Sequence, residues 1–178
     1  MLKRKSKISK KEYRCSKCGK LHYELPALGF KSPYYYDVLS DADKKQLAVL
    51  SDDFCIISYP DQTDRFIRTV LTIPIINSCE KLDYGIWVSV GEKSFNDYKE
   101  NFQNEASEPI YFGMICNEIK DYDESTLGIH VNVQVRSGGI RPEIIPHQSE
   151  HKLKSDWENG ILLEEAESRI NNILNNVG

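Results

Sequence analysis

The sequence predicts an α+β fold, in which an antiparallel β-sheet packs against a few helices and follows an N-terminal segment that resembles a zinc knuckle. Residues 84–90 and 127–135 alternate apolar with small or polar side chains, which is the period of a strand. Residues 94–106 and 163–176 instead repeat apolar side chains at three or four positions, the spacing of an amphipathic helix. Because short turns separate the strand-like segments, we expect neighbouring strands to pair antiparallel.

The expected strands are bounded by turn-forming residues. In chain order they are residues 54–57, 65–76, 84–90, 110–115, 126–136 and 140–145. Pro74 and Pro142 have no amide hydrogen to donate, which places them at an edge or a bulge of the sheet. Gly138 and Gly139 turn the chain between the last two strands, which therefore form a hairpin.

The expected helices carry recognisable start and stop signals. They are residues 41–50, 94–106, 152–159 and 163–176. Ser40, with Asp43 three positions later, resembles an N-terminal cap, and Ser94 is the candidate cap of the second helix. Pro109 should stop the second helix, and Gly160 should end the third.

The length of 178 residues, with 40% hydrophobic residues, predicts one domain over residues 12–178. The longest apolar stretches are shorter than the roughly 18 to 20 residues that cross a bilayer, and the N-terminus lacks the apolar stretch of a signal peptide. An odd number of cysteines, five, favours reduced thiols over a disulfide framework. We therefore expect a cytoplasmic protein without a membrane partner.

Charge is distributed unevenly along the chain. Six positive and no negative charges lie in the first eleven residues, at Lys3, Arg4, Lys5, Lys7, Lys10 and Lys11. Because the formal net charge of the whole chain is −4, residues 12–178 carry −10. Residues 1–11 are expected to be a disordered tail, since so few apolar side chains cannot offset the entropy lost on ordering. The acidic remainder favours a basic protein partner and disfavours nucleic acid.

The most specific motif is Cys15-Ser16-Lys17-Cys18-Gly19-Lys20-Leu21-His22. Two thiolates separated by two residues fit one tetrahedral ion on a tight turn, and Gly19 permits the positive φ that such a turn needs. His22 can reach back as a third ligand. Zinc is therefore the expected cofactor, bound by the segment of residues 13–25.

An ordered series of short motifs runs from Cys15 to about residue 161. It consists of Cys15, Cys18, Gly19 and His22, Leu25-Pro26, residues 51–55, Ile67-Arg68, Ile73-Pro74, residues 85–89, residues 111–113, Arg136, Gly139, Arg141-Pro142, His151 and residues 159–161. With this series the chain resembles a family of bacterial proteins known as domain of unknown function 2199. The resemblance implies a bacterial origin and a single domain, and it implies no activity.

A closed structural zinc site needs a fourth ligand besides the three residues of the motif. We expect Cys55 to supply it, because Cys55 lies in a short apolar strand and in a segment that matches the family. Cys79, His147 and His151 are the alternatives.

Catalytic signatures do not accompany the motif. Glu24 is close in sequence, but neither His-Glu-x-x-His nor the zinc deaminase pattern occurs. An open three-ligand zinc that holds a water is the alternative to a closed site. His130, Arg136 and Arg141 could converge on an anion across the last hairpin, although a solvated sheet face also explains them.

Together these patterns favour a non-enzymatic, zinc-binding module for a protein partner. By analogy of fold and charge, such a protein can serve as an immunity or accessory protein to a toxin. One alternative is a zinc-dependent hydrolase with an open site at Cys15, Cys18 and His22. The other is a nucleic-acid-binding zinc-ribbon protein that uses the basic tail.

Overall fold

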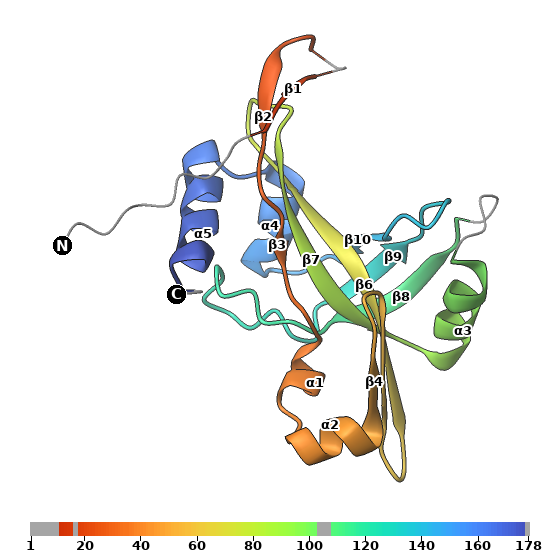
Figure 1. Ribbon diagram of the computed structural model, residues 1–178. Coiled ribbons are helices and arrows are strands. Elements are labelled where there is room, and N and C mark those ends of the chain that lie inside the picture. The colour runs from red at the N-terminus through yellow and green to blue at the C-terminus, as the bar shows by residue number, and fades with distance from the viewer. Residues whose placement is uncertain (1–10, 16–17, 103–107, 177–178) are drawn as a thin grey trace.

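A computed structural model describes residues 11–15, 18–102 and 108–176 and has an α+β fold (Figure 1). Its strands are β1 (Lys11–Arg14), β2 (Leu21–Glu24), β3 (Leu28–Gly29), β4 (Ala48–Leu50), β5 (Phe54–Ser58), β6 (Thr63–Pro74), β7 (Lys81–Val90), β8 (Ile110–Ile115), β9 (His130–Gln134) and β10 (Glu143–Pro146). Its helices are α1 (Tyr34–Asp37), α2 (Asp41–Leu47), α3 (Glu92–Asn101), α4 (Lys152–Asn159) and α5 (Leu163–Asn176).

The strands β6 to β10 close into a barrel. Each pairs antiparallel with the next along the chain, from β6 with β7 to β9 with β10. The ring closes where β10 pairs with β6, at Glu143 and Val70. The amide of Val70 also donates to the carbonyl of Pro142 at 2.8 Å. Pro142 thus takes part in the closure as an acceptor, the role that its missing amide hydrogen leaves open.

The expected sheet of antiparallel strands is too simple a description. The pairing of β10 with β6 is parallel, and so is the pairing of β3 with β7 at Leu28 and Tyr84. The strands β5 and β4 extend the sheet from β6 in antiparallel pairings. Residues 48–50, expected to continue the helix that begins at residue 41, instead form β4. Parallel partners far apart in the chain leave no hairpin turn between them, and this is why local patterns pointed only to antiparallel pairing.

The core lies inside the barrel and under the helices. Tyr84, Ile86 and Val88 of β7 point into a large cluster of buried side chains and are fully buried. Trp87, on the opposite face of β7, fills a smaller cluster with Cys55 and Phe66. Trp87 thus buries the second face of β7 at one position, whereas the other residues on that face are small, polar or charged.

The structure confirms the predicted start of α2 and the predicted end of α4, whereas the predicted start of α3 is wrong. Ser40 caps α2, and its hydroxyl accepts from the amide of Asp43 at 3.1 Å. Gly160 follows α4 with a φ of 77°, as a helix-ending glycine does. The cap of α3 is Gly91 rather than Ser94, which lies inside the helix. The predicted continuation of that helix to residue 106 falls in part on residues 103–107, outside the described residues.

The predicted strand of residues 126–136 is shorter in the structure. Only β9 is regular, and Thr126, expected on the outer polar face, is fully buried. Its hydroxyl donates to the carbonyl of Asn117 and accepts from the amide of Ile119. These bonds close the loop before β9, and they show that the alternation of apolar residues overstated the length of the strand.

The strands β1 and β2 form a separate two-stranded ribbon, which projects beside the turn that joins β6 to β7 (Figure 1). The predicted disordered tail of residues 1–11 falls on residues 1–10, outside the described residues, and on Lys11, which pairs with Glu24 in the ribbon. No helix among the described residues combines the length and the hydropathy of a membrane span.

Candidate metal centre

The β1–β2 ribbon holds the residues of the Cys-x-x-Cys motif around a tight turn. Tyr13 pairs with His22 in the antiparallel register. Beyond the last pair, the amide of Cys15 donates to the carbonyl of Lys20 and the amide of Gly19 donates to the carbonyl of Cys15. Gly19 has a φ of 70°, as its position in the motif predicts. The turn therefore presents Cys15, Cys18 and His22 together.

Cys79 completes the group. One ligand atom from each of Cys15, Cys18, His22 and Cys79 lies within 4.8 Å of all the others. Two sulfur ligands of a tetrahedral zinc, each about 2.3 Å from the ion, stand about 3.8 Å apart, so the four atoms are near enough to one another to surround one such ion. The Sγ atom of Cys18 lies 3.0 Å from Nε2 of His22, which identifies Nε2 as the nitrogen that faces the cage.

The turn between β6 and β7 positions Cys79. The amide of Ser78 donates to the carbonyl of Ile75, and the amide of Ile75 donates to the carbonyl of Glu80. Asn77 has a φ of 57°, a left-handed conformation that asparagine tolerates better than most residues. Ile75 also forms a bridge with Ile161, just after α4, so the turn is tied to the body of the protein.

The carboxylate of Glu80 lies near Nδ1 of His22, the imidazole nitrogen that faces away from the cage. Its Oε1 atom lies 3.6 Å from Nδ1 of His22 and accepts from the amide of Tyr23 at 3.0 Å. A carboxylate on the far nitrogen is the usual partner of a histidine that binds a metal. The sequence offered no signal for this role, because Glu80 is far from the motif and is one of many acidic residues.

The electrostatics of the group suit a cation. Hydrogen bonding with the thiols of Cys15 and Cys18, joined by desolvation, raises the pKa of Cys79 to about 11. Thiols this close oppose one another's ionisation, and a divalent cation removes that opposition because it binds thiolates directly. Cys15 is buried, whereas Cys18 and Cys79 are exposed, so an ion in the cage would lie near the surface.

Cys55, the expected fourth ligand, is placed elsewhere and is replaced in the group by Cys79. The side chain of Cys55 is fully buried in the smaller core cluster, near Trp87 and Cys116. Burial raises the pKa of Cys55 to about 12 and that of Cys116 to about 11. Both are therefore protonated at neutral pH and behave as small hydrophobic residues.

The other residues considered from the sequence do not converge. Arg136 pairs with Glu143, and Arg141 pairs with Asp53 at 2.6 Å. His151 caps α4 by accepting from the amide of Leu153. On the barrel wall, His130 lies against Phe112 and His147, and His147 Nε2 is 2.8 Å from Asn132. Each arginine thus has its own carboxylate, and no anion site forms among these residues.

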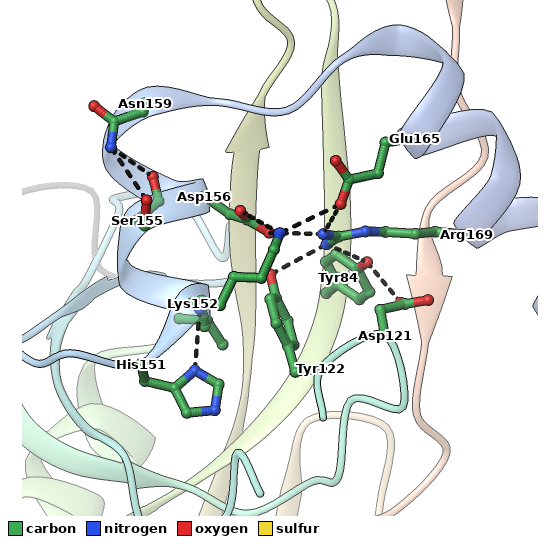
Figure 2. A network of polar contacts seen from close by, with 11 residues as sticks. Tyr84, Asp121, Tyr122, His151, Lys152, Ser155, Asp156, Asn159, Glu165 and Arg169 are labelled. Atoms are coloured by element: carbon green, nitrogen blue, oxygen red, sulfur yellow. Dashed lines mark hydrogen bonds and ion pairs between the residues drawn. The ribbon is translucent and has the colours of Figure 1, made fainter. Parts of the chain in front are cut away.

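A second polar cluster joins α4 and α5 to the barrel (Figure 2). The guanidinium of Arg169, 4% exposed as a residue, donates to the carboxylate of Asp156 at 2.6 Å and to the hydroxyls of Tyr84 and Tyr122. Lys152 also contacts Asp156. Desolvation raises the pKa values of both tyrosines above their ordinary range. Both hydroxyl groups therefore stay protonated at neutral pH while they accept hydrogen bonds from Arg169. The cluster is a packed anchor for α5.

Comparison with models of known protein families identified a match over most of the chain. A family model described as uncharacterized protein conserved in bacteria (DUF2199) matches residues 14–161. The matched span includes all four residues of the candidate metal centre and ends before α5. No curated protein and no solved structure matches the chain.

Proposed function

Because the chain belongs to the DUF2199 family of uncharacterized proteins conserved in bacteria, whose description assigns no activity, we propose a function from the geometry: a non-enzymatic protein-binding module with a structural zinc ion. The observation that carries the proposal is the set of four ligands. Three cysteines and one histidine fill a tetrahedral zinc and leave no position for a reactive water.

The location of the ligands supports a structural role. Three of them come from the β1–β2 ribbon and the fourth from the turn between β6 and β7, so one ion joins two segments far apart in the sequence. In a cage of this kind the binding energy of the metal contributes to folding. Zinc here would fix a projecting ribbon that has few other contacts with the barrel.

The partner class follows from charge. Residues 12–178 carry a net −10, which attracts a basic protein and repels phosphate. Association should weaken as salt rises, since charges at a surface are screened over about 10 Å at 0.1 M ionic strength. An immunity or accessory role towards a basic toxin would be one case of such binding.

X-ray absorption spectroscopy of the zinc-loaded protein tests the metal half of the proposal. The expected first shell is three sulfur atoms and one nitrogen. An oxygen ligand, together with hydrolysis of esters, amides or nucleotides that chelation abolishes and zinc restores, would instead support the open-site enzyme. The binding half is tested by isolating a partner from a bacterium that encodes the protein and measuring its affinity at low and high salt. An affinity that does not change with salt would contradict it.

A further inference from the structure

A groove lies where the ribbon meets the start of β7. Its volume is about 680 Å³. The ribbon side contributes Tyr13, Tyr23 and Glu24, the chain after β2 contributes Leu25, Pro26 and Ala27, and the barrel side contributes Glu80, Lys81 and Asp83. The two sides belong to the two segments that the metal centre joins.

The lining combines aromatic rings with carboxylates. Tyr13 is 38% exposed and Tyr23 is 43% exposed, so part of each ring faces solvent. Three carboxylates face one ammonium in the lining, which gives it a net negative charge. Exposed tyrosine faces attract guanidinium and ammonium groups, and nearby carboxylates add to that attraction.

The three carboxylates of the groove differ in the contacts that they make with other residues. Glu80 is committed to His22 and to the amide of Tyr23. Asp83 accepts from Thr72 at 2.7 Å and pairs with Lys81 at 3.2 Å. Glu24 is exposed and forms no ion pair with another described residue. An incoming cation would therefore meet Glu24 first, and it would compete with Lys81 for Asp83.

We propose that this groove binds an extended basic segment of a partner protein, with arginine or lysine side chains against Tyr13 and Tyr23 and their charges at Glu24 and Asp83. The inference rests on the proposed function, since it names the surface that a binding module would use. The metal centre keeps the groove open, because Cys79 joins the turn between β6 and β7 to the ribbon. Zinc therefore regulates the groove through shape, without touching the bound segment.

The test uses the zinc-loaded full chain and a fluorescein-labelled octapeptide of alternating Arg and Gly, followed by fluorescence anisotropy. A peptide of alternating Glu and Gly is the control for charge. Glu24→Gln should weaken binding of the arginine peptide by about two- to fivefold, the range of an exposed ion pair, and Tyr23→Ala by a similar factor. Lys81→Met should tighten binding, because it removes the competing cation from Asp83.

Glu100→Gln is the matched control, since it removes the same charge from the exposed surface of α3, at a distance from the ribbon (Figure 1). It should leave peptide binding nearly unchanged, and zinc content should stay at one ion per chain in all these variants. Removing zinc should abolish binding of the arginine peptide to the groove.

Equal weakening of arginine-peptide binding by Glu24→Gln and Glu100→Gln would overturn the proposal that the groove is the binding site. It would leave the proposed binding module intact, with attraction by its overall negative charge. Weaker binding in Lys81→Met would also overturn it. If the peptide binds only after residues 1–10 are removed, the chain's own basic tail is the occupant and the proposal of a partner segment fails. Equal affinity for the acidic and basic peptides would contradict the proposed function itself.

Discussion

His22 and Glu80 meet across the junction between the β1–β2 ribbon and the barrel, with Nδ1 of the imidazole 3.6 Å from Oε1 of the carboxylate. The same oxygen accepts from the backbone of Tyr23. One side chain thus contacts the ring and hydrogen-bonds to the strand that carries it. The metal centre and the position of the ribbon are coupled through this contact.

Cys79→Ser should lower zinc affinity strongly, because it removes a thiolate from the cage. Cys55→Ser is the matched change at a buried cysteine outside the cage and should keep one zinc per chain while lowering stability. Elemental analysis after dialysis, with competition against a chromophoric chelator, measures both variants. The reverse result, with zinc lost in Cys55→Ser and kept in Cys79→Ser, would restore Cys55 as the ligand.

Glu80→Gln should reduce zinc affinity by about 10- to 100-fold, the usual effect of losing the carboxylate behind a ligating histidine. Glu24→Gln, which removes an acidic side chain from the same groove, is the control and should leave zinc affinity nearly unchanged. Competition with a chelator measures the two affinities. Equal effects in both variants would mean that Glu80 acts only through the net charge of the surface.

Arg169→Met should destabilise the fold by about 3–5 kcal/mol, since it leaves the buried carboxylate of Asp156 without its buried partner. Lys152→Met removes the other cation near Asp156. Because the side chain of Lys152 is 58% exposed, this change should cost about 1 kcal/mol or less. Urea unfolding of the zinc-loaded proteins gives both values. A loss in Arg169→Met no larger than in Lys152→Met would show that the buried pair is not what anchors α5.

Acid should weaken the same anchor. Burial alone would raise the pKa of Asp156, but hydrogen bonds from Lys152 and Arg169 outweigh it and lower that pKa below its ordinary value. The stability that depends on the ionised carboxylate is therefore complete above the unfolded pKa, about 3.9, and is lost as the pH falls through the lower folded pKa. Urea unfolding at several pH values below 5 should show a smaller decline in Asp156→Asn than in the parent. An identical decline would contradict the prediction.

Gly160→Ala should destabilise the protein beyond the cost of a left-handed alanine. A Cβ at Gly160 would lie 2.8 Å from the carbonyl oxygen of Pro74, just before the turn that holds Cys79. Gly128 has nearly the same φ, 78°, with no described heavy atom within 4 Å of an added Cβ, so Gly128→Ala is the control for an alanine at positive φ without a close contact. We expect a loss of about 1–3 kcal/mol in the control and a larger loss in Gly160→Ala. Thermal melts compare the two, and equal losses would exclude the clash.

Local patterns in the sequence predicted much of the fold. The strands β5 to β8 and the hairpin of β9 and β10 have short-range signals, namely alternation and turn glycines, and so does the start of α2 at Ser40. The closure of the barrel at Val70 and Glu143 has no local signal, because it depends on how the twist and length of all five strands add up.

The candidate metal centre, too, could be predicted from the sequence only in part. Cys15, Cys18 and His22 could be predicted because they share one turn and have a recognised spacing. The fourth position could not, because the choice between Cys55 and Cys79 depends on which strand end lies under the ribbon. An apolar neighbourhood, which drew attention to Cys55, indicates burial in the core rather than access to an ion.

The single parallel contact that closes the barrel has a kinetic consequence. Each pairing from β6 through β10 joins neighbours in sequence and can form early, whereas Val70 and Glu143 can meet only after the intervening strands are in place. Until then, part of β6 presents unpaired backbone groups that another nascent chain could pair with. Slow folding at high protein concentration should therefore favour aggregation through β6, and dilution during refolding should raise the yield of native protein.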